Sequence, residues 1–290
     1  MKLIHSSAEV WRQEYSLEGA YKAIERAARL SYKSEDKITV DSAKPFVEGL
    51  IKRKHLAPLE FGTIYLTIPS NDSDKKSYLF SKFVDNPYSK IQGPDEYLNW
   101  NITTNLRVLI ENSLLEMCIP YIKGQNCNHY NRITIHVICS RGISHEIVRH
   151  RKLSFMQESQ RFINYSKGKF GKEITYILPS WYKTENLDSN NIVDKTSNQA
   201  EMDWQKSLRT SESVYFSLLD QQLLPQYARD VLPNATKTEL AICGFASDWK
   251  HFFDLRYFGT TGSPHPDMLD LSTKMKAALE QKNLWTLISK

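Results

Sequence analysis

The sequence predicts a single α+β domain with two or more strands and about seven helices. Two observations predict this class. Apolar residues recur at helical spacing in several segments, whereas apolar and polar residues alternate in two shorter segments, as they do in half-buried strands. Hydrophobic residues make up 41% of the 290 residues, which is enough for a sizeable core. Because no internal repeat or hinge-like linker divides the chain, we expect one domain over residues 1–290.

The first third of the chain predicts two helices followed by a strand. Residues 17–30 carry apolar side chains at helical spacing, and residues 45–51 begin with a proline, which the first turn of a helix tolerates. Residues 61–68 alternate in polarity and predict a strand that Pro69 ends. Residues 70–93 are polar and broken, so we expect a loop there.

The middle of the chain predicts a helix over residues 106–117, a strand over residues 133–137 and a helix over residues 140–149. Ser140 is a suitable N-cap for the second helix, because its hydroxyl can accept a hydrogen bond from a free backbone N–H of the first turn. Further along, residues 184–199 are polar and rich in Asn, Asp and Ser, and we expect an exposed insertion there.

The last third of the chain predicts helices only. Residues 204–218 place apolar side chains at helical steps. Thr236 and Glu239 have the spacing of a capping box, which predicts a long helix that they open and that ends near residue 255. A turn-rich break over residues 259–266 precedes a last helix, expected over residues 267–281.

Composition limits the class of protein. The net charge of +5 is spread along the chain and suits anionic small molecules as well as nucleic acid. The longest apolar runs are far too short to span a bilayer and the chain starts with a polar segment, so we expect a cytoplasmic protein without a membrane partner. The four cysteines form no Cys-x-x-Cys pair, which favours reduced thiols, with Cys139 in a strand and Cys243 in a helix of the core.

The strongest functional signal is a basic cluster at residues 149–161, where five basic side chains fall within thirteen residues. Guanidinium groups match pairs of phosphate oxygens, so the cluster predicts an anion-binding site rather than a solvated basic loop. The sequence His145-Glu146-x-x-x-His150 is similar to the His-Glu-x-x-His zinc motif. Its extra residue places the two histidines about 140° apart on a helix, so we expect no metal here.

Three blocks of the sequence resemble the flavin-dependent thymidylate synthases. The first is the Arg-His-Arg sequence at residues 149–151, followed after seven residues by Ser159. The second is a His-x-x-Pro-Leu-Glu segment at residues 55–60. The third pairs Arg229, which precedes Val-Leu-Pro at a distance of one residue, with Arg256 at the end of a predicted helix. The order and separation of the three blocks are similar to those of the family.

The resemblance implies a small mixed sheet with packed helices, assembled into a homotetramer whose active sites lie between subunits. It implies methylation of dUMP to dTMP, with FAD as cofactor, NADPH as reductant and methylenetetrahydrofolate as carbon donor. In such a reaction the cofactor carries the difficult chemistry, and the protein orients and polarises the substrate. We therefore expect Ser159 to position the nucleotide rather than to attack it, because a serine nucleophile needs a nearby base.

The resemblance also implies roles for individual residues. The implied nucleotide-binding residues are Glu146, Arg149, Gln157, Glu158, Ser159, Gln160, Arg161, Arg229 and Arg256. The implied cofactor-binding residues are His55, Ala57, Glu60, Arg149, His150, Arg151, Gln157, Ser247 and His251. Arg256 is also the expected catalytic residue, because a cation near the pyrimidine stabilises the negative charge that develops when C5 acts as a nucleophile. Taken alone, Arg256 fits a cation that serves a helix dipole, and His55 fits a helix cap.

The sequence also departs from the family's pattern. Phe61 stands where the family usually has His, and Phe162 where it usually has Tyr. Phe245 and Ser247 stand where it commonly has Asn and Arg as flavin contacts. These departures keep a second interpretation open, a related flavin- and folate-dependent methylation or hydroxymethylation of another pyrimidine nucleotide, such as dCMP. A nucleic-acid-binding protein would need basic residues interleaved with exposed aromatics along one face, whereas the basic residues scatter, so we expect no nucleic-acid partner.

Overall fold

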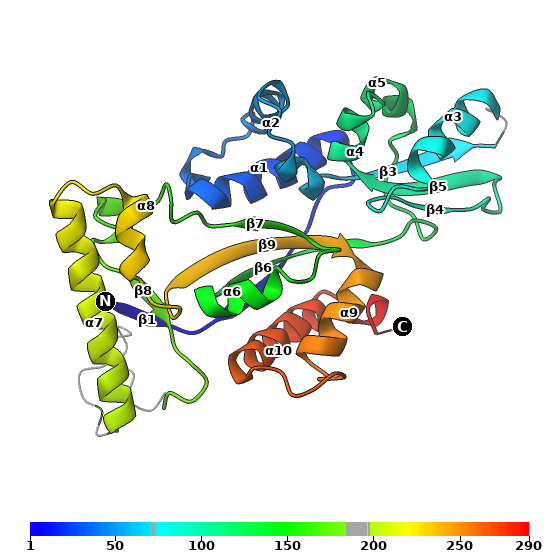
Figure 1. Cartoon of the computed structure of the whole chain (residues 1–290). Coiled ribbons are helices and arrows are strands. Elements are labelled where there is room, and N and C mark those ends of the chain that lie inside the picture. The colour runs from blue at the N-terminus through cyan, green and yellow to red at the C-terminus, as the bar shows by residue number, and fades with distance from the viewer. Residues whose placement is uncertain (71–72, 184–195, 197, 290) are drawn as a thin grey trace.

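The computed structural model describes residues 1–70, 73–183, 196 and 198–289, and it has an α+β fold of three small sheets with packed helices (Figure 1). The predicted α+β class is therefore confirmed. The central sheet has the strand order β2-β6-β9-β7, and every neighbouring pair in it is antiparallel. Its strands are β2 (Ser7–Trp11), β6 (Arg132–Ser140), β9 (Lys237–Phe245) and β7 (Ser154–Gln157).

Strand β9 occupies the segment that the sequence predicted as the first half of a long helix, and that prediction is wrong. β9 pairs with β6 along its whole length, from Arg132 opposite Phe245 to Ser140 opposite Lys237. Because β9 is buried on both faces, its sequence is a nearly continuous apolar run rather than an alternation. Such a run is compatible with a helix or a strand, and here the pairing with distant β6 decides for the strand. Helix α9 (Ala246–Arg256) begins only where β9 ends.

Helices cover both faces of the central sheet (Figure 1). On one face, α9, α10 (Pro266–Gln281) and α6 (Arg141–Ile147) enclose the main core, in which Trp249 is fully buried. On the other face, α1 (Leu17–Tyr32) packs against β9, where it covers Cys243. Cys243 is thus buried as expected, but it lies in a strand and not in a helix.

A second sheet, with the order β3-β5-β4, lies beyond the end of the central sheet and has its own core with α1, α2, α3 and α4 (Figure 1). Its elements are α2 (Ala43–Lys52), β3 (Thr63–Pro69), α3 (Ser73–Phe83), β4 (Lys90–Gln92), β5 (Asn99–Asn105), α4 (Leu106–Glu111) and α5 (Leu115–Cys118). The loop predicted over residues 70–93 is wrong, because this segment contains α3 and β4. Leu79 and Phe83, one helical turn apart, bury a narrow apolar stripe that the polar surroundings conceal in the sequence. The helix predicted over residues 106–117 is interrupted at Ser113, whose φ is 55°.

A third, parallel pair joins β1 (Lys2–Ile4) to β8 (Thr175–Ile177), and its core includes residues of α7 (Gln199–Asp220) and α8 (Pro225–Ala228). Most of the insertion expected at residues 184–199 lies outside the described residues. Short 3-10 helices cover Glu35–Lys37, Ala57–Phe61, Ile119–Tyr121, Gly168–Phe170, Arg229–Val231 and Trp285–Leu287. The remaining predicted elements are confirmed. The helices at 17–30, 45–51, 140–149 and 267–281 and the strands at 61–68 and 133–137 agree within three residues at their ends, whereas the helix predicted at 204–218 begins five residues earlier, at Gln199. Over the residues described, no helix combines the length and apolarity needed to cross a membrane.

Candidate active site

The Arg-His-Arg sequence at residues 149–151 lies in the turn between α6 and β7. Ser140 caps α6 as predicted, since its hydroxyl accepts a hydrogen bond of 3.3 Å from the Ile143 N–H. His150 is 7% exposed and packs on the Phe252 ring, with 4.7 Å between ring centroids. Arg149 and Arg151, by contrast, are exposed. The turn therefore anchors its histidine in the fold and leaves two guanidinium groups accessible to an anion.

Arg256, at the end of α9, meets this turn and α6. Its Nε donates to His150 Nε2 at 3.1 Å, and its Nη1 donates to the Glu146 carboxylate at 2.7 Å. A further bond of 3.3 Å runs from Nη2 to the Glu146 carbonyl. Burial lowers the pKa of His150 to about 4, and the positive charge of Arg256 and the neighbouring His251 add to the effect. At neutral pH His150 is thus an uncharged acceptor that helps to fix the guanidinium plane.

The second sequence block is tied to the start of β7 through Glu60. Glu60 is 9% exposed, and its carboxylate accepts hydrogen bonds from the Ser154 hydroxyl and, at 2.6 Å, from Arg107 of α4. Arg132 donates to the Glu60 carbonyl at 2.8 Å. His55 and Ala57, which precede this anchor, are exposed. In this block, His55 and Ala57 are therefore accessible to a ligand, whereas the Glu60 carboxylate is bonded to Arg107 and Ser154 within the fold.

Gln157 and Glu158 leave β7 with their side chains in hydrogen bonds. The Gln157 amide donates to the hydroxyls of Ser144 and Thr238, at 3.0 and 3.2 Å. Glu158, whose side chain is 2% exposed, accepts from Lys237 at 2.9 Å. The Glu158 carboxylate thus forms an ion pair with Lys237 within the fold. Its predicted contact with a nucleotide stays a prediction.

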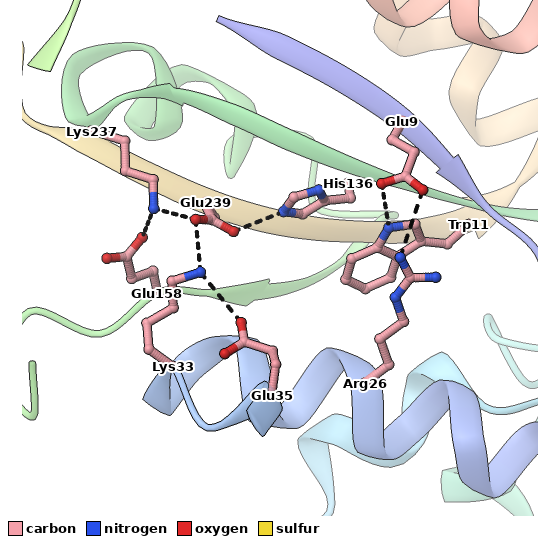
Figure 2. A network of polar contacts seen from close by, with 9 residues as sticks. All are labelled: Glu9, Trp11, Arg26, Lys33, Glu35, His136, Glu158, Lys237 and Glu239. Carbon is pink, nitrogen blue, oxygen red and sulfur yellow. Dashed lines mark hydrogen bonds and ion pairs between the residues drawn. The ribbon is translucent and has the colours of Figure 1, made fainter. Parts of the chain in front are cut away.

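That ion pair belongs to a larger network on the α1 side of the central sheet (Figure 2). Glu239 accepts from Lys237, from Lys33 at 2.7 Å and from His136 at 3.0 Å. Burial alone would raise the pKa of Glu239, but the hydrogen bond from His136 and the charges of Lys237 and Lys33 outweigh it and hold the pKa well below its ordinary range. Trp11 stacks on the His136 ring at 4.8 Å, so the network extends to the edge strand β2.

The end of the basic cluster lies against the C-terminus of α1. The Ser159 N–H donates to the Ser31 carbonyl at 2.9 Å, while the Arg161 side chain is exposed. Gln160 is 7% exposed, and its Nε2 is among the buried polar atoms of the described residues that have no hydrogen-bond partner. The Tyr165 phenol is the polar neighbour of this side chain within the fold.

Arg229 lies close enough to Arg141, the first residue of α6, for its charge to act on it. Burial lowers the pKa of Arg141, and the like charge of Arg229 lowers it further. The buried Tyr165 phenol interacts with the Gln160 side chain, and the charge of Arg141 also acts on it. Two guanidinium groups whose charges act on each other are suited to an anionic ligand rich in acceptor oxygens, such as a phosphate group.

Comparison with known proteins identifies the family. Residues 96–282 match the sequence model of the thymidylate synthase complementing protein family, which covers more than half of the chain. The chain belongs to this family. The resemblance inferred from the three sequence blocks is thereby confirmed at the level of the family.

Among relatives of this family member, the flavin-dependent thymidylate synthase of Pyrococcus furiosus is 30% identical over 118 residues, which cover 41% of this chain and 43% of the relative. The flavin-dependent thymidylate synthase of Corynebacterium aurimucosum is 32% identical over 121 residues, which cover 40% of this chain and 46% of the relative. The chain thus matches less than half the length of these curated relatives. A solved UMP/dUMP methylase, PolB from Streptomyces cacaoi bound with 5-Br dUMP, aligns with 100% of this chain and 97% of its own at 16% identity and a TM-score of 0.47.

In this member of the thymidylate synthase complementing protein family, some of the residues singled out from the sequence are in contact and others are not. Arg256, Glu146 and His150 are in direct contact, with His251 5.9 Å from His150 between ring centroids. Arg229 precedes β9 in the chain, whereas Arg256 is the last residue of α9, the helix that follows β9. Ser247 lies in the first turn of α9, where Lys90 of β4 donates to its hydroxyl.

Three residues of these surroundings were not found from the sequence: Lys90, Arg107 and Arg141. Lys90 lies in the segment interpreted as a loop, and Arg107 in a helix with no recognised motif. Arg141 follows the predicted cap Ser140, but nothing in its neighbours along the chain indicates that Arg229 lies beside it. Among the residues that the structure describes, no group of three or more His, Cys, Asp or Glu side chains could hold a metal ion.

The depressed pKa of His150 leads to a prediction about stability. Above pH 6.5 the imidazole is neutral in both the folded and the unfolded chain, so its titration does not affect stability. As the pH falls from 6.5 towards about 4, the unfolded chain takes up a proton that the folded chain refuses. The free energy of unfolding should therefore fall over this range by up to about 3 kcal/mol. Chemical denaturation at a series of pH values measures it.

The matched variants are His150→Gln, which should flatten this part of the pH profile, and His5→Gln at an exposed position, which should not. If the profile of the His150 variant coincides in slope with that of the unchanged protein between pH 6.5 and 4, the imidazole is not held neutral in the fold.

Proposed function

We propose that the chain catalyses the flavin-dependent methylation of dUMP to dTMP, with methylenetetrahydrofolate as carbon donor and NADPH as reductant. Family membership supports this proposal, and one observation carries it furthest. Arg256 contacts Glu146 and His150, although more than a hundred residues separate them in the sequence. Residues that the resemblance assigned independently to catalysis, nucleotide binding and cofactor binding thus form one hydrogen-bonded group.

Arg256 is proposed to act on the pyrimidine. A guanidinium beside the ring stabilises negative charge that develops when C5 becomes nucleophilic, and it contributes most if it is already oriented before the reaction. Glu146 and the neutral His150 provide this orientation, because they hold Nη1 and Nε from two sides. Arg229 and Arg141 are suited to the phosphate of the same nucleotide, and Ser159 is proposed to position it.

The cofactor is proposed to be FAD, and the residues present fit it. Arg149 and Arg151 are exposed cations on an anchored turn, which suits the diphosphate of a dinucleotide. When bound, the flavin supplies the redox and one-carbon transfer chemistry. The chain's own residues then have three tasks: to bind the two anionic ligands, to orient their rings, and to polarise the pyrimidine through Arg256.

Replacing both Arg149 and Arg151 with alanine should weaken FAD binding. Loss of a charged hydrogen-bond donor to phosphate costs about 1.5–3 kcal/mol, hence roughly tenfold or more in Kd for each residue. Titration followed by flavin fluorescence measures the change. Arg12→Ala, at an exposed position in β2's C-terminal flank, is the control and should bind FAD as before. Equal affinity in the double variant would exclude these arginines from the cofactor site.

A homotetramer with shared active sites is part of the proposal. The charge of Arg229 reaches Arg141 at the start of α6, and Arg256 contacts Glu146 near the end of the same helix. The proposal of shared sites rests on the resemblance, which implies active sites between subunits. Closed rotational symmetry would repeat the same composite site at each position in the oligomer.

The second candidate is methylation or hydroxymethylation of another pyrimidine nucleotide, such as dCMP. The departures at Phe61, Phe245 and Ser247 favour it, because they change the side chains where flavin contacts are implied, and Phe61 and Phe245 are both buried. The deciding experiment is mass spectrometry of the products from dUMP and from dCMP, each with NADPH and methylenetetrahydrofolate. Conversion of dUMP to dTMP supports the proposal, whereas a product from dCMP alone, or one that carries a hydroxymethyl group, replaces it with the second candidate.

A further inference from the structure

Glu158 is among the residues implied for nucleotide binding, yet its side chain is bound inside the fold. This side chain is 2% exposed, and its Oε2 accepts a hydrogen bond of 2.9 Å from Lys237 Nζ. The Glu158 backbone N–H donates to the Glu239 carbonyl, also at 2.9 Å. Because Gln157 lies opposite Leu240, this bond continues the pairing of β7 with β9 by one residue. Both the backbone and the side chain of Glu158 are therefore attached to β9.

The residues on either side of Glu158 are attached to other elements. The Gln157 amide donates to α6, which lies on the opposite face of the central sheet from α1. Successive residues of a strand point to opposite faces, so the Glu158 side chain is directed to the α1 side. The Ser159 N–H donates to the Ser31 carbonyl near the end of α1, at 2.9 Å. The place of Glu158 thus helps to fix Ser159 and the exposed Arg161 that follows it.

A second carboxylate shares the cation that binds Glu158. Figure 2 shows Lys237 Nζ between the carboxylates of Glu158 and Glu239, with a bond to each. Lys33, the C-cap of α1, donates to Glu239 at 2.7 Å. Burial alone would lower the pKa of Lys33, but the charges and hydrogen bonds of its acidic neighbours, Glu239 first, outweigh burial and raise it. Two ammonium groups and two carboxylates therefore compensate one another on the α1 side of the sheet.

The charge of Glu158 reaches one of the arginines that are suited to the phosphate. Burial and the charge of Arg229 lower the pKa of Arg141, while the charge of Glu158 is among the effects that raise it. A carboxylate only accepts hydrogen bonds, so it cannot bond to the oxygens of a phosphate group and instead repels them. Lys237 offsets this repulsion, because its ammonium group lies 2.9 Å from the carboxylate. Without Lys237, a buried negative charge would act on a site proposed for an anion.

We infer that Glu158 is a positioning residue rather than a ligand of the nucleotide, and that Lys237 holds and neutralises its carboxylate. The inference rests on the proposed function, in which Ser159, the next residue, positions dUMP. It replaces the contact that the resemblance implies for Glu158. It also gives a role to Lys237, which lies 79 residues further along the chain and belongs to no recognised motif.

The two roles of Glu158 predict different results for the same variants. If Glu158 contacted the nucleotide, Glu158→Gln would lose a charged acceptor and bind dUMP roughly tenfold or more weakly. If Glu158 positions the turn, the glutamine carbonyl can still accept from Lys237, and the Kd for dUMP should stay within a few-fold. Lys237→Met leaves a buried carboxylate without this partner and should raise the Kd by roughly tenfold to a hundredfold. Combining both substitutions removes the uncompensated charge and should restore most of the affinity.

The experiment is a calorimetric titration of the full chain with dUMP, together with the melting temperature of each variant. Arg29→Met is the matched control, because it also breaks a buried ion pair. Arg29 donates to Glu25 at 2.7 Å, and the two side chains are 11% and 2% exposed, compared with 15% and 2% for Lys237 and Glu158. The control should lower the melting temperature and leave the Kd for dUMP unchanged. If Lys237→Met does not fold, Glu158→Gln alone decides between contact and positioning.

The inference is wrong if Glu158→Gln weakens binding as much as Lys237→Met does, or if the double variant fails to recover affinity. Unchanged binding in Lys237→Met, or an equal loss in Arg29→Met, also contradicts it. If the unchanged protein does not bind dUMP, the proposed function fails, and hydrogen exchange of the ligand-free chain decides. Lys237→Met should then speed the exchange of the Ser159 N–H, and the double variant should slow it again. Equal exchange in all variants ends the inference.

Discussion

Replacing Arg256 with alanine should lower kcat for dUMP methylation by roughly 100- to 1000-fold, which is the usual loss when one oriented donor to a developing negative charge is removed. Arg256 is 22% exposed in its side chain and is held on two sides by Glu146 and His150. Its orientation is therefore established before a ligand arrives, so its proposed action on the pyrimidine would need no reorganisation.

Arg256→Lys should also lower kcat, because an ammonium group lacks the planar fork that bonds both Glu146 and His150. The loss should be smaller than in Arg256→Ala, because the lysine keeps the positive charge. A group that acts only in the transition state lowers kcat and kcat/KM together, so steady-state kinetics in dUMP distinguish the roles. Lys250→Met on the exposed side of the same helix is the control and should keep full activity. A variant with unchanged kcat and a raised KM would show that Arg256 holds the nucleotide without acting on the reaction.

The sequence predicted the parts of the site that depend on local pattern. The cap at Ser140, the short helix after it and the turn that carries Arg149 and Arg151 all follow from neighbours along the chain. The family could be inferred for the same reason, since its blocks are short and their spacing is fixed by local structure. The contact of Arg256 with His150 in this turn was not predicted, because it joins residues that are far apart in the chain.

What the sequence could not predict depends on partners far apart in the chain. β9 has an apolar run that fits a helix or a strand, and only its pairing with β6 removes the ambiguity. Because the segment around Lys90 is polar, the sequence did not predict helix α3 and strand β4 there. It therefore did not predict that Lys90 contacts Ser247. Glu158 was assigned from its motif alone, whereas the ion pair with Lys237 needs both strands in register.

The proposed sharing of active sites predicts that two inactive variants should restore each other. Figure 1 shows α8, which directly precedes Arg229, beside one end of β9, while α9, which ends at Arg256, follows the other. If one nucleotide contacts Arg229 of one chain and Arg256 of another, then Arg229→Ala and Arg256→Ala each damage every site in their own oligomer.

Mixed oligomers of the two variants would contain sites in which both arginines are intact. With equal amounts and random exchange, each arginine is present at a given site with even odds, so about a quarter of the sites should regain full activity. The measurement is dUMP methylation at a substrate concentration well below the KM of Arg229→Ala, after the two variants are unfolded and refolded together. The control is the same assay on the separately refolded variants, mixed only at the end. Activity that stays at the level of this control, although light scattering shows that oligomers have formed, would mean that both arginines serve a nucleotide from within one chain.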